Sequence, residues 1–211
     1  MEREKMQERF MQDIADHEMT IIRDEGVHRH LRFKRPKTMA YYFDVITWPG
    51  SLCIHGDCGT YVFSRTEDMF NFFKMDRNDF NHDRTEGLQI NPYYWEEKLQ
   101  AADMKRRGVG GTREYSQEKF QKAVKDRYDD FYMHSDSPDK EVWERLEDEV
   151  LWAESEESAH RAAAEFEHNG FDLVDFWEND LTEYTFGFIW NLFAIAYCVR
   201  EYENSQQKVA A

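Results

Sequence analysis

The chain has 211 residues, a formal net charge of −16 at neutral pH, and aromatic residues at 16% of its positions. This length is enough for one domain, or for one domain with an appended lobe, and the aromatic content can supply a sizeable core. Its four Pro and ten Gly argue against a disordered chain and against a turn-rich all-β fold. A strongly acidic surface repels nucleic acid and anionic membranes, so neither is an expected partner of the acidic parts.

The three cysteines, at positions 53, 58 and 198, are an odd set without a paired framework, which favours a reducing compartment. The N-terminal residues lack the apolar core of a signal peptide. The most apolar run, residues 186–199, is interrupted by Asn191 and is shorter than the roughly 20 residues that span a bilayer. We therefore expect a cytoplasmic protein without a membrane segment.

The N-terminal half predicts a helix followed by a small sheet. Residues 3–19 carry apolar side chains at helical spacing. Alternating and β-branched residues then predict strands that are joined by turns at Pro49-Gly50 and Gly56–Gly59, as in an antiparallel meander. The predicted strands are residues 31–33, 40–48, 52–55 and 60–65.

After the sheet, residues 66–73 predict a helix capped by Thr66, and residues 75–91 a loop. A second helix is expected over residues 92–104, with Pro92 at its first position. The basic, glycine-rich residues 105–115 predict a linker.

The remainder predicts helices. Ser116, Ser137-Pro138 and Ser155 are typical helix starts, and Thr182 is expected to cap a last helix over residues 183–203. That helix is apolar almost all round, so we expect it to be central and to support a homodimer.

These elements predict an α+β fold, with a small N-terminal antiparallel β-meander and a predominantly helical remainder. The expected organisation has an N-terminal part of residues 1–104, the linker of residues 105–115, and an acidic helical lobe of residues 116–211 packed on the same core.

The net charge is concentrated between Asp129 and Glu183, where 19 acidic residues face only three lysines and arginines. A surface of this kind can imitate the phosphate charge of nucleic acid and dock on a basic protein groove. The alternative is an ordinary solvated face. Trp152 either lies among the carboxylates as an interface anchor or turns inward where the helix ends. The candidate partner-binding residues are Asp129, Asp130, Glu141, Glu144, Asp148, Trp152, Glu154, Glu156 and Glu157.

Residues 28–37 form a basic segment that either binds phosphate or RNA, or pairs with acids of the same chain or of a second subunit. His28 with His30, and Cys53 with His55, could contribute to a metal or catalytic cluster together with Asp57 and Cys58. No second ligand pair completes a metal site, so we expect no metal, no cofactor and no catalytic residue.

The N-terminal half contains the motifs Leu31-Arg32-Phe33, Tyr42-Phe43-Asp44, Thr47-Trp48-Pro49-Gly50, the stretch from Gly56 to Phe63, and Asp68-Met69-Phe70. With these motifs, about residues 17–75 resemble a group of uncharacterised proteins of phages and prophages. The resemblance implies an accessory protein of a bacterial virus, acting in the bacterial cytoplasm. With the acidic window, it favours an anti-CRISPR-type inhibitor of host defence that blocks a basic, nucleic-acid-handling protein. The alternatives are an enzyme acting on nucleic acid or nucleotides through the cluster at positions 28–58, and a structural dimer.

Overall fold

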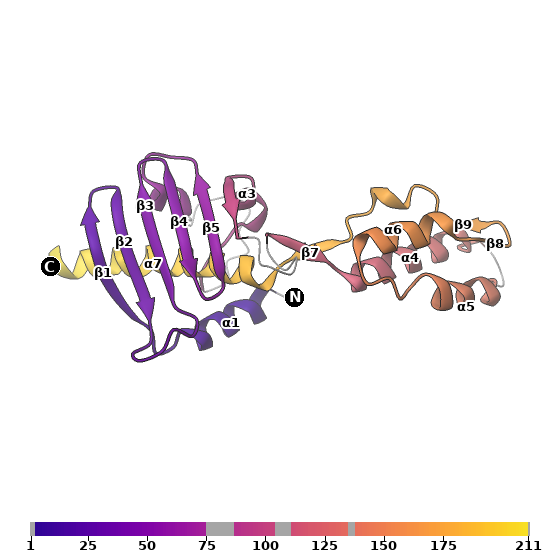
Figure 1. Cartoon of the computed structure of the whole chain (residues 1–211), viewed down its shortest axis with the longest axis horizontal. Helices are drawn as coiled ribbons and strands as arrows, with labels where there is room; N and C mark the ends of the chain where they lie inside the picture. The colour runs from indigo at the N-terminus through magenta and orange to yellow at the C-terminus, as the bar shows by residue number, and fades with distance from the viewer. Residues whose placement is uncertain (1–2, 75–86, 104–110, 135–137, 211) are drawn as a thin grey trace. The chain divides into compact units, whose positions relative to one another are not determined.

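The computed structural model describes residues 3–74, 87–103, 111–134 and 138–210, and the chain divides into two compact units (Figure 1). Unit 1 consists of Met1–Thr112 together with Tyr184–Ala211, and unit 2 of Arg113–Glu183. Unit 2 is therefore inserted between two segments of unit 1.

This division differs from the expected one. The last helix, α7 (Phe186–Ala210), belongs to unit 1 and not to an acidic lobe of residues 116–211. The buried apolar residues also form two separate clusters, one in each unit, instead of one shared core. Residues 105–110 of the expected linker lie outside the described residues, and Arg113–Tyr115 form a strand, β7. Periodicity shows which face of a helix is apolar but not which distant element covers it.

Unit 1 is built on a six-stranded antiparallel sheet in which each described strand pairs with the next along the chain. The α+β fold with an N-terminal antiparallel meander is thus confirmed. The strands, in sheet order, are β1 (Glu18–Glu25), β2 (His28–Lys34), β3 (Phe43–Trp48), β4 (Ser51–Gly56), β5 (Gly59–Ser64) and β6 (Leu99–Ala102).

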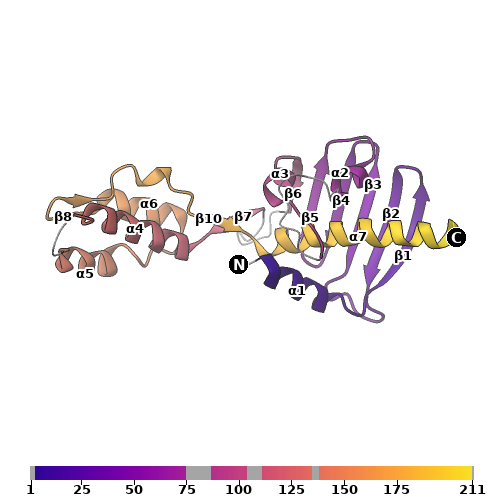
Figure 2. The ribbon, with the colours of Figure 1, turned by 180° about the vertical axis from the view of Figure 1, so that it is seen from behind.

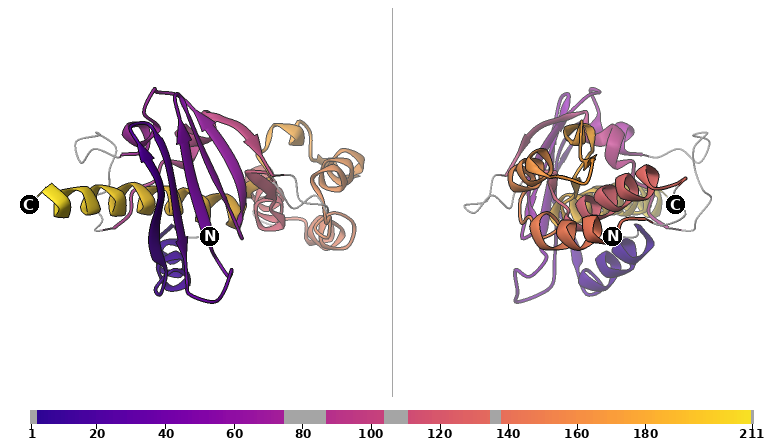
Figure 3. Two further views of the ribbon diagram at one scale, coloured as in Figure 1. Left: turned by 60° about the vertical axis from the view of Figure 1, so that its left-hand side comes forward. Right: turned by 90° about the vertical axis from the view of Figure 1, so that its right-hand side faces the viewer.

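The sheet of unit 1 buries one face. Alternate residues of β2 to β5 point to that face, where α7 runs across the strands with α1 (Arg3–Asp13) beside it (Figures 2 and 3). Two short helices, α2 (Met69–Phe73) and α3 (Pro92–Glu96), add Phe73 and Trp95 to the same core.

The apolar part of helix α7, residues 186–199, is enclosed within unit 1, whereas Arg200, Asn204 and residues 206–208 are exposed. Phe188, Trp190, Phe193 and neighbouring apolar residues of α7 are fully buried. Phe10 of α1 packs edge-on against Trp190, with ring centroids 5.1 Å apart. The apolar circumference from which we expected a homodimer through the last helix is therefore covered by the chain itself.

Unit 2 surrounds the second core with helices and short strands. Its residues Phe120, Leu146 and Phe171 lie at the centre of that core. Strand β7 pairs with β10 where the chain enters and leaves the unit, and β8 pairs with β9 as a small hairpin. The elements are α4 (Gln117–Phe131), α5 (Lys140–Glu149), α6 (Glu156–Glu165), β8 (Glu167–His168), β9 (Phe171–Asp172), the 3-10 helix η1 (Phe176–Glu178) and β10 (Thr182–Tyr184).

Several predicted boundaries are wrong for local reasons. Asp68, not Thr66, caps α2 by accepting a hydrogen bond from Phe70 N. The expected helix over residues 92–104 stops after one turn because the chain turns back to pair β6 with β5. Thr182 lies in β10, and α7 begins later, where Thr185 Oγ1 accepts a hydrogen bond from Phe188 N.

The structure describes all three cysteines, and none of them forms a disulfide. Within the described ranges, every helix falls short of the length and apolar character that crossing a membrane requires.

The end of β4 depends on a glycine. A Cβ atom on Gly56 would lie 2.1 Å from the carbonyl oxygen of Tyr42, a backbone atom that cannot move without shifting the start of β3. We expect Gly56→Ala to lower the free energy of unfolding of unit 1 by about 1–3 kcal/mol. Hydrogen exchange measured by mass spectrometry should show faster exchange in β3 to β5. Unit 2 serves as the internal control, and faster exchange there as well would contradict this account.

Candidate functional site

The candidate surface is built on α5, which begins after Asp139. The side chain of Asp139 caps the helix by accepting a hydrogen bond from Glu141 N at 3.0 Å. The predicted start at Ser137-Pro138 is therefore shifted to Asp139. Val142 and Leu146 face the core, so Glu144 and Asp148, one turn apart, face solvent.

All nine predicted partner-binding residues are exposed. Three of them have a basic neighbour: Lys125 pairs with Asp129, His168 lies 3.3 Å from Glu141, and His160 lies 3.9 Å from Glu156. In the part of the chain that the structure describes, no ion pair involves the carboxylates of Glu144 or Asp148. Glu144 and Asp148 therefore present uncompensated negative charge, whereas Glu149 of the same helix pairs with Arg145 at 2.6 Å.

Trp152 lies at the end of this row of acids. Helix α5 ends at Glu149, and the chain buries Val150 before it turns Trp152 outward, where 73% of the residue is exposed. Of the two positions that the sequence left open for Trp152, the structure has the exposed one. We call Glu141, Glu144, Asp148 and Trp152 the α5 ridge.

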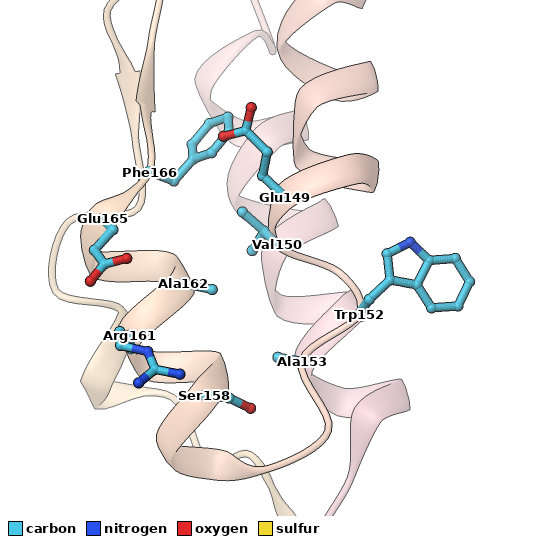
Figure 4. Close-up of a pocket in the computed structure, with 9 residues that line it drawn as sticks. All are labelled: Glu149, Val150, Trp152, Ala153, Ser158, Arg161, Ala162, Glu165 and Phe166. Atoms are coloured by element: carbon cyan, nitrogen blue, oxygen red, sulfur yellow. The ribbon is translucent and has the colours of Figure 1, made fainter.

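Two grooves adjoin the end of the α5 ridge, and Trp152 contributes to both. The first, between α5 and α6, has a volume of about 440 Å³ and an apolar floor that includes Val150, Ala162 and Phe166. Figure 4 shows the indole of Trp152 pointing away from this groove. The second, between α4 and α5, has a volume of about 630 Å³ and is lined by Trp143, Leu151 and Trp152 among others.

Sequence reasoning missed three groove residues. Trp143 is half-buried and lines the second groove. Its indole N–H donates a hydrogen bond to Glu147, 2.7 Å away, which also lines that groove. Arg161 lines the first groove. A helical wheel of α5 places Trp143 and Glu147 on one flank, but the neighbouring helix that makes this flank a groove is not visible in the sequence.

Bases on α4 offset several acids of unit 2, and Arg145 of α5 offsets Glu149. Lys119 donates to Asp180 at 2.9 Å, Lys122 pairs with Asp126, and Arg127 lies 3.7 Å from Asp172. Hydrogen bonds from Thr182 and Lys119 hold the pKa of Asp180 far below its ordinary value. Among the described residues, Glu144, Asp148, Glu154 and Glu157 have no ion pair, so unbalanced negative charge lies on α5 and at the start of α6.

The second predicted cluster, at positions 28–58, is dispersed. His30 and Cys53 lie on β2 and β4, with Ile46 of β3 between them in the ladder. His55 interacts with Thr60 and Tyr42, and the described residues contain no group of three or more potential ligands that could hold a metal ion. Burial raises the pKa of the Cys53 thiol, which disfavours the reactive thiolate.

The basic segment of residues 28–37 pairs within unit 1. Arg29 makes two hydrogen bonds to Asp68, at 2.9 and 3.0 Å. Arg32 makes two to Asp44, at 2.8 and 2.7 Å, and Arg35 lies 3.2 Å from Asp16. Of the interpretations that the sequence left open, the contacts of these three arginines favour internal pairing.

Three comparisons with known proteins were made. No family model, no curated protein and no solved structure matches the chain. The site therefore has to be interpreted from its own geometry.

Asp44 of β3 contacts Arg32 and His30 of the basic segment, and these contacts should make the stability of unit 1 sensitive to acid. Its carboxylate is 7% exposed, and burial acts to raise its pKa, but hydrogen bonds and charge from Arg32 and His30 lower it overall. Because the folded pKa is depressed, the stabilisation is present above the unfolded pKa of about 3.9 and is lost as the pH falls through the folded pKa.

We expect Asp44→Asn to lower the free energy of unfolding of unit 1 by about 1–3 kcal/mol at pH 7, and to weaken its dependence on pH below about 4. Urea unfolding of both proteins across this pH range measures the effect. Asp16→Asn is the control, since its carboxylate is 71% exposed and should contribute little. Equal losses in the two variants would contradict the role given to Asp44.

Trp152 should not contribute to the stability of unit 2. We expect Trp152→Ala to change the free energy of unfolding by no more than about 0.5 kcal/mol, because the side chain stands in solvent. Leu146→Ala, in the core of the same unit, should cost about 2–5 kcal/mol. The two variants are compared by urea unfolding, with hydrogen exchange of residues 113–183 as the signal for unit 2. A loss above about 1 kcal/mol for Trp152→Ala would show that the indole packs in solution.

Proposed function

We propose that the protein is a non-enzymatic binding protein whose α5 ridge docks on the basic surface of another protein. The observation that carries the proposal is the exposed Trp152 at the end of a row of acids, with a groove on either side. Exposed aromatic residues of this kind are typical anchors of protein interfaces, and surrounding carboxylates raise the rate of encounter with a basic partner.

The charge distribution supports a protein partner over nucleic acid. The carboxylates of Glu144 and Asp148 would repel a phosphate backbone. The basic groove with which another protein binds nucleic acid would attract them. The partner is accordingly a nucleic-acid-handling protein, and the ridge takes the place of its nucleic acid.

The resemblance to phage and prophage proteins suggests a biological role for this binding. In that role the protein is an inhibitor of a bacterial defence system, of the anti-CRISPR type, and acts in the cytoplasm of the bacterial host. The runner-up, an enzyme working through residues 28–58, has weaker support because those side chains are dispersed over the sheet.

The test is charge reversal on the ridge. The triple variant Glu141→Lys, Glu144→Lys and Asp148→Lys should weaken binding to the partner by at least about tenfold at 0.1 M salt, because attraction becomes repulsion. Trp152→Ala alone should weaken binding by about 30-fold, as expected for the loss of an anchor worth about 2 kcal/mol. Capture from a nuclease-treated bacterial lysate identifies the partner, and titration calorimetry with the purified partner gives the affinities.

The matched control reverses three exposed acids of unit 1, Glu4, Glu8 and Glu67, and should leave the affinity nearly unchanged. The wild-type protein should also displace nucleic acid from the partner, with an effect that falls steeply as salt increases. An affinity that survives both the triple reversal and Trp152→Ala, or a partner that still binds its nucleic acid in the complex, would refute the proposal.

A further inference from the structure

Strand β1 is an edge of the sheet in unit 1. Among the described strands, it comes first in the sheet order and pairs with β2 alone (Figure 1). Nearly all of its residues are exposed, including the apolar Ile21 and Ile22 at 41% and 49%. An edge of this kind offers its backbone N–H and C=O groups to another strand.

A β-bulge gives this edge an unusual pattern of charge. In the β1–β2 ladder Ile21 lies opposite Leu31 and Arg23 lies opposite His30, so Ile22 is an extra residue. Glu18 lies opposite Lys34. Lys34 and His30 are four residues apart on β2, so their side chains point to the same face of the sheet. Glu18 and Arg23 therefore point to the same face of the sheet, although five positions separate them in sequence.

We propose that a second copy of this chain adds its β1 to this edge, antiparallel, about a two-fold axis at Thr20. The two sheets then form one continuous sheet. Glu18 lies opposite Arg23 of the partner subunit, and the reciprocal pair repeats the contact on the other side of the axis. Met19 lies opposite the partner's Ile21, so apolar side chains meet on the buried face. Ile22 stays outside the ladder on each strand.

Charge complementarity favours this register over the one centred on Ile21. In the favoured register Arg23, which pairs with Glu25 of its own chain at 2.6 Å, is shared with Glu18 of the partner subunit. Moving the axis to Ile21 would place Glu18 opposite Glu25 of the partner subunit, and like charges directly opposite each other destabilise a strand pair. The same shift would place Met19 opposite the partner's Asp24, an apolar residue against a carboxylate. The register centred on Thr20 opposes unlike charges and pairs apolar residues with each other.

Helix α7 leaves room for the second copy. It approaches β1 at Asp24, whose carboxylate accepts hydrogen bonds from Tyr202 at 2.9 Å and Gln206 at 3.1 Å. Asp24 lies three pairs from the axis, or about 10 Å at the rise of a strand. The two helices therefore cross the seam roughly 20 Å apart, which exceeds a helix diameter of about 10–12 Å.

A charge swap tests both the dimer and its register. Sedimentation equilibrium over a range of concentrations should show the wild-type chain as a dimer. Glu18→Arg alone and Arg23→Glu alone should each weaken dimerisation by at least about tenfold, because two pairs become like-charged. The double variant Glu18→Arg with Arg23→Glu restores both pairs and should return the dimerisation constant to within about threefold of wild type. Glu8→Arg, an equal change on an exposed position of α1, should have no effect.

A second measurement does not depend on charge. Thr20→Cys places one thiol from each copy at the axis, so a short bis-maleimide should cross-link two chains rapidly. Thr60→Cys, on β5, is the control and should cross-link far more slowly. A monomeric wild-type chain, single variants that dimerise normally, a double variant that stays weakened, or equal cross-linking at positions 20 and 60 would each overturn the proposal.

Discussion

The need to enclose α7 determines the arrangement of unit 1. This helix carries apolar side chains around most of its circumference, and a helix of that kind is stable in water only when other elements cover it on several sides. The sheet covers one side, and α1 brings Phe10 against Trp190, Phe193 and Tyr197. The approach is close enough that a Cβ atom on Gly187 would lie 2.8 Å from the carbonyl oxygen of Cys58. The inward faces of the strands are consequently apolar, whereas their outward faces are free to be polar.

The two units of the chain differ in how their charges are paired. Unit 1 neutralises its basic segment internally, through pairs such as Arg29 with Asp68 and Arg32 with Asp44. Unit 2 pairs its own bases along α4 and leaves Glu144 and Asp148 of α5 without an ion pair among the described residues. Negative charge is thereby concentrated on one part of one unit. The like charges of such a surface repel one another and lower the stability of the unit, a cost that a binding role for the surface would explain.

The sequence predicts the elements whose signals are local. Alternation identified β2 to β5, and the side chains of Ser116 and Ser155 identified the starts of α4 and α6 by their ability to accept backbone N–H groups. Strands β1 and β6 were missed because their pattern does not alternate, and they are held by pairing with strands that already exist. The exposure of the ridge acids followed from helical spacing. The grooves beside Trp152 could not be predicted, since they depend on the distance between helices that are remote in sequence.

The position of α7 after unit 2 in the chain has a consequence for synthesis on the ribosome. Residues 113–183 leave the ribosome before α7 and have a core of their own, so they can fold while the rest of the chain is incomplete. The sheet of unit 1 is made earlier, but the helix that covers its apolar face is translated only after unit 2. During that interval Phe33, Phe43 and Phe63 have no α7 to pack against. The nascent sheet is therefore exposed to chaperones and to aggregation for as long as unit 2 takes to be translated.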